Sequence, residues 1–176
     1  MDYWAPNGTV YKGGSTVEVQ APLTTLPVFQ RHGSVVPQIQ LDDETVLVLR
    51  THDDGTAHSG GVYDDDGITT NAQLRDEFFL LRTETRYGDE VTLTARVEHA
   101  VWRPTWRHIR WEVSGPSVEG WESVHCGGAA LPRASTGTET RAEASGWWSV
   151  VEGGGKASLV LPLTAEAGWE LSCVAR

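Results

Sequence analysis

Two acidic clusters contain the residues of this sequence that are best suited to chemistry. Asp64, Asp65 and Asp66 precede a glycine, and a shorter Asp53-Asp54-Gly55 run lies upstream. Oxygen ligands grouped in one loop could bind Ca²⁺, but the spacing lacks the alternate acids and the sixth-position glycine of an EF-hand loop. An Asp-Gly pair is equally typical of a tight turn. We therefore interpret both clusters as turns and expect no metal site, with Asp64, Asp65 and Asp66 as the metal-ligand candidates.

Tryptophan is the second unusual feature, because eight of the 176 residues are Trp. An indole ring can stack on the apolar face of a sugar while nearby charged side chains bind its hydroxyls. The candidates for such contacts are Trp102, Trp106, Trp147 and Trp148. Packing in a core or an interface is the commoner role of these rings, and we favour it for most of them. The adjacent pair 147–148 is special, because strand alternation turns one of the two rings away from the core.

Other catalytic patterns are missing from the sequence. The six histidines show no metal-binding spacing, and there is no nucleophile elbow, P-loop or dinucleotide-binding glycine motif. Paired carboxylates can hydrolyse a glycosidic bond, but nothing marks one pair of acids here as special. The sequence therefore predicts no catalytic residue and no cofactor.

Short β-rich segments between turn signals must position these residues. Residues 16–20 and 106–113 alternate polar and apolar side chains, as half-buried strands do, while residues 45–49 form a continuous apolar run typical of an interior strand. Gly88-Asp89 is suited to a hairpin loop between strands at residues 78–87 and 90–98. Further strands are expected at residues 121–125, 147–151, 157–163 and 169–174. The helix-like spacing of Leu74, Phe78 and Leu81 is short, and we interpret it as strand.

These strands predict an all-β chain whose sheets pack face to face in a β-sandwich. A polar break at residues 42–44 is the predicted boundary, which divides the chain into units 1–44 and 45–176. Hydrophobic residues make up 39% of the sequence, enough to build a packed core.

Charge and hydropathy exclude several partners. The net charge of -10 repels phosphate, so we expect neither nucleic acid nor an anionic membrane surface as a partner. No run of about 18 apolar residues is present, so membrane insertion is not expected. The first residues lack the pattern of a signal peptide, and no targeting signal is found in the chain. Cys126 and Cys173 could form a disulfide in an oxidising lumen or remain two buried thiols, which is the commoner arrangement.

Three segments together resemble the C-terminal part of glycoside hydrolase family 31. The first is DYW at residues 2–4 followed by YKGG at 11–14, and the second is APLTTLPVFQRHGSVVP at residues 21–37. The third combines DGTA, GVYDDDG and RDEF within residues 54–78. The second segment is the most specific, and its Phe-Gln-Arg version is most similar to the glucosidase II type of the family.

The resemblance implies a partial proximal C-terminal β-domain at residues 1–44 and a distal C-terminal β-sandwich domain at 45–176. It also implies that the sequence starts inside the proximal domain. The family's two catalytic aspartates lie on a preceding (β/α)₈ barrel, one of them in a W-x-D-M-N motif that is absent here. We therefore expect no catalytic barrel and no catalytic residue in this chain. Arg31, Gly33 and Ser34 match a family segment that we interpret as scaffold, with the glycine at a bend.

The function expected from the resemblance is that of a non-catalytic β-region of a retaining α-glucosidase that trims N-glycans or α-glucans. Its partners would be the catalytic barrel, in the same or a separate chain, a glucosidase II β-type subunit and a glycan. The parent family implies the lumen of the endoplasmic reticulum. The alternative is a free-standing module that binds carbohydrate or protein.

Overall fold

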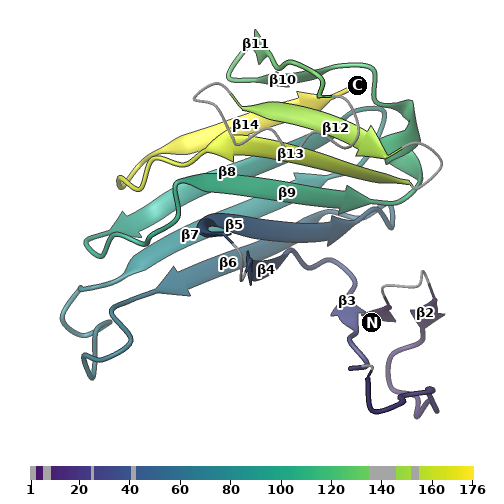
Figure 1. The fold of residues 1–176 in the computed structure, drawn as a ribbon, viewed down its shortest axis with the longest axis horizontal. Coiled ribbons are helices and arrows are strands. Elements are labelled where there is room, and N and C mark those ends of the chain that lie inside the picture. The colour runs from purple at the N-terminus through teal and green to yellow at the C-terminus, as the bar shows by residue number, and fades with distance from the viewer. Residues whose placement is uncertain (1–2, 6–8, 25, 41–42, 135–145, 152–154) are drawn as a thin grey trace.

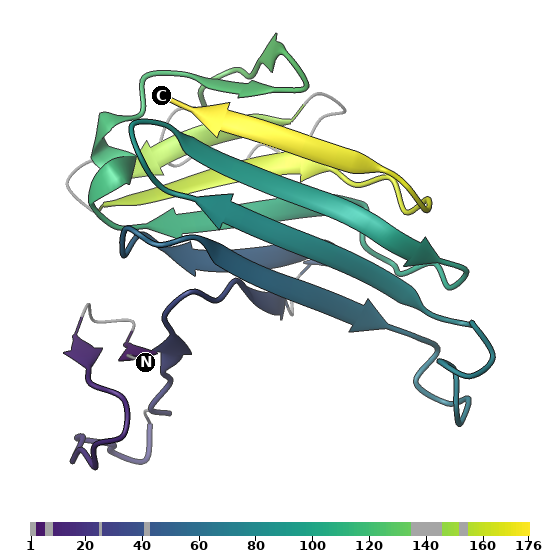
Figure 2. The same cartoon turned by 180° about the vertical axis from the view of Figure 1, so that it is seen from behind.

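A β-sandwich and a small separate sheet make up the fold. The computed structural model describes residues 3–5, 9–24, 26–40, 43–134, 146–151 and 155–176. In this part of the chain nearly every regular element is a strand, and a single short 3₁₀ turn, η1 (Pro116–Gly120), is the exception. Figure 1 shows the five-stranded layer of the sandwich in front, and Figure 2 shows the six-stranded layer from behind. The all-β sandwich predicted from the sequence is confirmed.

The six-stranded sheet has the order β11-β10-β14-β8-β7-β6, with antiparallel pairing throughout. Its strands are β6 (His58–Asp64), β7 (Phe79–Arg86), β8 (Val91–Ala100), β10 (Val124–Cys126), β11 (Ala129–Ala130) and β14 (Glu170–Ala175). The predicted hairpin at Gly88-Asp89 joins β7 to β8, and Val91, Leu93, Ala95 and Val97 all face the core.

The five-stranded sheet has the order β12-β13-β9-β5-β4. Its strands are β4 (Val36–Gln40), β5 (Asp43–His52), β9 (His108–Ser114), β12 (Trp147–Val151) and β13 (Lys156–Pro162). As predicted, β5 is an interior strand, which pairs antiparallel with β4 and parallel with β9. Alternation along β9 places Ile109, Trp111 and Val113 in the core between the two sheets.

The first part of the chain forms a separate three-stranded sheet. It contains β1 (Tyr3–Trp4), β2 (Val10–Tyr11) and β3 (Gln30–Arg31) in the order β2-β1-β3. It lies beside the sandwich, next to the β4 edge, in both views (Figures 1 and 2). We call it the N-terminal sheet. Because β4 already pairs with β5, the sandwich begins before residue 44, and the domain division at that residue stays a prediction.

A short segment joins the N-terminal sheet to the sandwich. Gly33 takes a positive φ of 74°, which makes the bend expected at this glycine. Gly33 and Val35 then exchange backbone hydrogen bonds with Ser59 on β6, and the Val35 side chain enters the core. The Val35 side chain and this backbone bridge thus help to fasten the N-terminal sheet to the sandwich.

Three expectations from the sequence need correction. Residues 16–20 form no strand, because no neighbouring strand pairs with them. Residues 70–76 are turns that carry positive φ at Asn71 and Asp76, so the strand begins only at Phe79. Cys126 and Cys173 are joined by a disulfide and are not separate thiols, since they stand opposite each other where β10 pairs with β14.

Candidate functional site

Three of the four tryptophans proposed for sugar contact are packed into the sandwich. Trp106 is buried edge-on against Phe79, with ring centroids 6.0 Å apart. Trp148 is buried and donates its indole N–H to the carbonyl of Leu131 at 3.1 Å. Trp102 is half-buried and donates its indole N–H to Asp64 at 2.9 Å. Their rings support the fold, and a role in sugar contact for them stays untested.

Trp147 is the ring that alternation turns outward. On β12 it stands opposite Val160, which in turn stands opposite Arg110 on β9. Its side chain is half-buried on the outer face of the five-stranded sheet, while Trp148 faces the core. The sequence argument for this pair thus holds, and it makes Trp147 the more accessible of the two.

The acidic residues at the end of β6 and in the loop that follows hold their carboxylates in hydrogen bonds. Asp64 accepts from Trp102, Asp65 accepts from the Tyr63 hydroxyl and from a backbone N–H, and Asp66 accepts from two backbone N–H groups and from Thr69. The Thr69 hydroxyl lowers the pKa of Asp66. The backbone contacts of Asp65 and Asp66 are those of an Asx-turn loop. Among the described residues no group of three metal-binding side chains converges, and the absence of a metal here stays a prediction.

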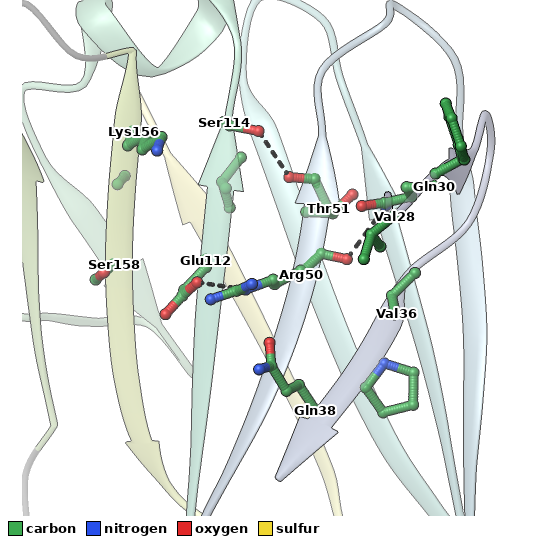
Figure 3. A pocket seen from close by; sticks show the side chains of 14 residues that line it. Val28, Gln30, Val36, Gln38, Arg50, Thr51, Glu112, Ser114, Lys156 and Ser158 are labelled. Atoms are coloured by element: carbon green, nitrogen blue, oxygen red, sulfur yellow. Dashed lines mark hydrogen bonds and ion pairs between the residues drawn. The ribbon is translucent and has the colours of Figure 1, made fainter. Parts of the chain in front are cut away.

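A groove lies between the N-terminal sheet and the outer face of the five-stranded sheet. Its volume is about 570 Å³. The segment before β3 forms one wall with Val28 and Phe29, and the floor crosses β4, β5, β9 and β13. Figure 3 shows Arg50 and Glu112 at the centre of the floor, with Ser158 on one side. We call this feature the junction groove.

Polar contacts fix the shape of the junction groove. Arg50 Nε donates to Glu112 Oε2 at 2.7 Å across the β5–β9 pair. Gln30 donates its side-chain amide to the carbonyl of Ser34 at 2.8 Å and lies 3.5 Å from that of Arg50. The ring of Phe29 meets Tyr11 edge-to-face, with centroids 5.3 Å apart. Both the wall and the floor are therefore held before any ligand arrives.

A buried polar network lies at the attachment of the N-terminal sheet. His58 Nε2 donates to Asp54 at 2.7 Å, because a carboxylate can only accept, and His32 from the joining segment lies 3.1 Å from the same carboxylate. On the other side of the imidazole, Nδ1 lies 3.1 Å from the Thr51 hydroxyl, which is 2.8 Å from that of Tyr87. The chain of contacts links the joining segment to both sheets.

The polar network contains the carboxylate of Asp54, which stays charged down to low pH. Burial alone would raise the pKa of Asp54, but hydrogen bonds from His58 and Thr56 outweigh it and lower the pKa from 3.8 to about 2. Burial likewise raises the pKa of Tyr87 and lowers that of His52. His58 is buried, so although Thr51, His58 and Asp54 have the residue types of a catalytic triad, no substrate can reach them. We interpret the network as structural.

Sequence reasoning missed the junction groove. Alternation along β9 correctly placed Glu112 on the outer face, but its partner Arg50 depends on the parallel register of β5 and β9. That register joins residues 62 positions apart. Alternation shows which side chains share one face of a strand, but it does not show which strand pairs with it. The sequence around Arg50 or Glu112 therefore could not predict that the two residues meet.

The chain is similar in sequence to α-glucosidases. It is 32% identical over 105 residues to Neutral alpha-glucosidase AB from Homo sapiens, a match that covers 54% of this chain and 11% of the relative. It is 27% identical over 113 residues to Alpha-glucosidase 2 from Bacillus thermoamyloliquefaciens, which covers 61% of this chain and 14% of the relative. The chain thus matches about a tenth of these relatives' length. It matches no model of a known protein family.

Solved structures show the same fold as part of larger enzymes. A dextranase of glycoside hydrolase family 31 from Flavobacterium johnsoniae superposes with a TM-score of 0.80 at 21% identity, covering 99% of this chain and 23% of the enzyme. An α-1,4-glucan lyase from Gracilariopsis lemaneiformis gives 0.74 at 17% identity, covering 99% of this chain and 20% of the other. The N-terminal sheet is included in both matches, since almost the whole chain is covered.

The fold is therefore that of an all-β region that occurs within these larger enzymes. The similar sequences and the similar structures both point to glycoside hydrolase family 31, which confirms the resemblance seen in the sequence. The chain is related to this family, consistent with a C-terminal region of its members. None of the described helices is long and apolar enough to span a membrane.

Proposed function

We propose that the chain is the non-catalytic C-terminal β-region of a retaining α-glucosidase and that it braces the catalytic (β/α)₈ barrel. One observation carries the proposal. Among the described residues, twelve large hydrophobic side chains are exposed, and eight of them lie between Val10 and Ile39, in less than a quarter of the chain. So dense an apolar surface is typical of a protein interface.

The exposed side chains fit a large protein partner better than a small ligand. Leu23 and Leu26 project almost fully into solvent from an irregular segment and do not line the junction groove. Covering a Leu side chain contributes about 1.5–3 kcal/mol. The barrel of a family 31 enzyme is the partner that the comparisons support, because this fold occurs there within much longer chains.

The finer assignment to the glucosidase II type is part of the same proposal. The Cys126–Cys173 disulfide supports an oxidising compartment such as the lumen of the endoplasmic reticulum. A β-type subunit would then be a further partner, and N-glycans or α-glucans the substrates of the whole enzyme. A bacterial α-glucosidase matches almost as well as the human one, so sequence similarity alone does not select this type.

A binding experiment tests the bracing role. The purified chain is added to the catalytic portion of a family 31 α-glucosidase made without its own C-terminal β-region, and association and melting temperature are measured. We expect binding that raises the melting temperature of the barrel. Replacing the two most exposed apolar side chains of this region by Leu23→Asp and Leu26→Asp should weaken binding by about tenfold or more.

A matched control distinguishes binding through this surface from nonspecific hydrophobic association. Ile68 and Leu74 are equally exposed, but they lie in the loop between β6 and β7. Ile68→Asp and Leu74→Asp should leave binding unchanged. Equal losses in both pairs of variants, or no association at all, would contradict the bracing role. Turnover of a chromogenic α-glucoside by the purified chain would contradict its non-catalytic character.

A further inference from the structure

We propose that the junction groove is a binding site for a neutral oligosaccharide. The inference applies to the chain without a docked barrel, because Val28, Phe29 and Val36 in the wall of the groove belong to the exposed apolar side chains that the proposed barrel contact would cover. The site is distinct from the tryptophans that the sequence suggested, because none of them lines it. Its volume of about 570 Å³ is within the usual range of small-ligand sites.

The wall and the floor of the junction groove differ in chemistry. Val28, Phe29 and Val36 supply an apolar wall, and the Phe29 side chain is 38% exposed. A sugar presents a C–H face that packs on such a surface, above all on an aromatic ring. The floor, in contrast, is polar along its centre (Figure 3). The C–H face of a sugar ring could therefore pack on the wall while its hydroxyls form hydrogen bonds with the floor.

The floor offers donors and acceptors side by side. The Arg50 guanidinium donates, the Glu112 carboxylate accepts, and the Ser158 hydroxyl does both. A sugar hydroxyl also donates and accepts, so alternating groups of this kind satisfy it, whereas a surface of cations alone would select an anion. Arg50 and Glu112 also neutralise each other at 2.7 Å. Lys156 also lines the groove and adds one cation, whose ammonium can donate to a further hydroxyl. The net charge of -10 opposes an anionic ligand and the two groove cations oppose a cationic one, so we expect an uncharged ligand.

The floor of the groove is preorganised by the sandwich, which reduces the entropic cost of binding there. The Arg50–Glu112 hydrogen bond holds the floor, and the Gln30 amide holds the wall segment against Ser34. Phe29 is in addition held by its contact with Tyr11. A segment of a protein partner is the other occupant to consider, and the test below distinguishes it from a saccharide.

The test is a nuclear magnetic resonance titration of the purified chain with maltotriose and, separately, isomaltotriose. We expect saturable shifts at backbone amides of β4, β5 and β9 that line the groove, with a dissociation constant on the order of 1 mM, as is common for small polar ligands in open sites. Arg50→Ala should weaken this binding by about tenfold, because it removes donors and leaves Glu112 unpaired.

A second ion pair provides the matched control. Arg82 Nε donates to Glu98 Oε2 at 3.0 Å on the outer face of the other sheet, with side chains 58% and 37% exposed, against 52% and 33% for Arg50 and Glu112. Arg82→Ala should bind saccharide like the wild type. Glu112→Gln keeps the shape of the side chain and weakens the ion pair, so it tests the floor should Arg50→Ala alter the fold.

Three outcomes would overturn the proposal. The first is an absence of saturable shifts with both saccharides. The second is shifts that lie outside the groove, for example around Trp147. The third is equal affinity in Arg50→Ala, Glu112→Gln and the wild type. Shifts of the groove amides on addition of a family 31 barrel, without any response to saccharide, would assign the groove to a protein partner instead.

Discussion

The sandwich and the N-terminal sheet place similar apolar residues in opposite surroundings. Leu49, Leu81, Ile109 and Leu159 have no exposed surface between the two large sheets, whereas Leu23 and its neighbours in the N-terminal region lie in water. Among the residues before Val35 whose burial is described, Ala5 is the single buried one. Two-residue strands cannot cover their own faces. From this comparison we infer that the sandwich folds by itself and that the N-terminal sheet requires a partner to cover its apolar side chains.

The largest expected effect is the difference in lost stability when an aromatic side chain is removed from each of the two regions. Trp111→Ala removes a fully buried ring from the sandwich and should lower the free energy of unfolding by about 3–5 kcal/mol. Phe29→Ala in the N-terminal region should cost less than about 1 kcal/mol, since its ring is already partly in water. Urea denaturation of both variants measures the two values. Similar losses would mean that the N-terminal sheet contributes to a common core.

The sandwich could be predicted from the sequence because the alternation and turn residues of its strands are visible in short segments. Ile109, Trp111 and Val113 alternate with polar residues, and the Gly88-Asp89 turn marks a hairpin, so face and order follow locally. The N-terminal region lacked such support, and residues 16–20 alternate in sequence without forming a strand. Alternation shows that a segment could line a sheet, but a strand also needs a hydrogen-bonding neighbour.

The candidate site was less predictable for a similar reason. The junction groove depends on the position of the N-terminal sheet relative to the sandwich and on the parallel register that joins Arg50 to Glu112. The Cys126–Cys173 bond also depends on a pairing between distant strands. Contacts of this kind form only after folding brings distant segments together, so residue type and spacing could suggest the participants but not their pairing.

The disulfide gives the next largest expected effect, and it acts inside the sandwich. Cys126 and Cys173 close a loop across 47 positions of sequence. Reduction, or the double change Cys126→Ala and Cys173→Ala, should lower the free energy of unfolding by about 2–4 kcal/mol. Thermal unfolding with and without reductant tests it. Unchanged stability after verified reduction would show that the β10–β14 pairing suffices without the bond.

The polar network predicts a smaller effect where the two regions meet. The pKa of Asp54 falls from 3.8 to about 2 on folding, so its contribution is fully present above about pH 4 and is lost as the pH falls toward 2. Asp54→Asn should cost about 1–2 kcal/mol at neutral pH, in keeping with the loss of a charge-assisted hydrogen bond from His58.

The pH dependence of stability checks this contribution. The difference in unfolding free energy between the wild type and Asp54→Asn should shrink between pH 4 and 2, where the wild-type carboxylate becomes protonated. Asp65→Asn is the control, because the hydrogen bonds described for this carboxylate come from Tyr63 and Gly67, each two residues away in sequence. A difference that stays constant with pH would contradict a native carboxylate at Asp54.

The acidic loop of the sandwich predicts the smallest effect. Because Asp64, Asp65 and Asp66 already accept hydrogen bonds from other groups of the chain, we expect neither millimolar Ca²⁺ nor a chelator to change the melting temperature by more than about 1 °C. Differential scanning calorimetry provides the value. A Ca²⁺-dependent rise of several degrees that disappears in Asp65→Asn would identify a metal site and refute the turn interpretation.

The central claim is that the sandwich folds by itself and the N-terminal sheet does not. Hydrogen exchange tests this claim most directly. In the purified chain, backbone amides of β5 and β9 should exchange only through global unfolding, because these strands pair on both sides and face the core. Amides of β1, β2 and β3 should exchange far sooner through local opening. Equal protection in the N-terminal sheet and in β5 and β9 would show that it closes on itself, and would contradict its need for a partner.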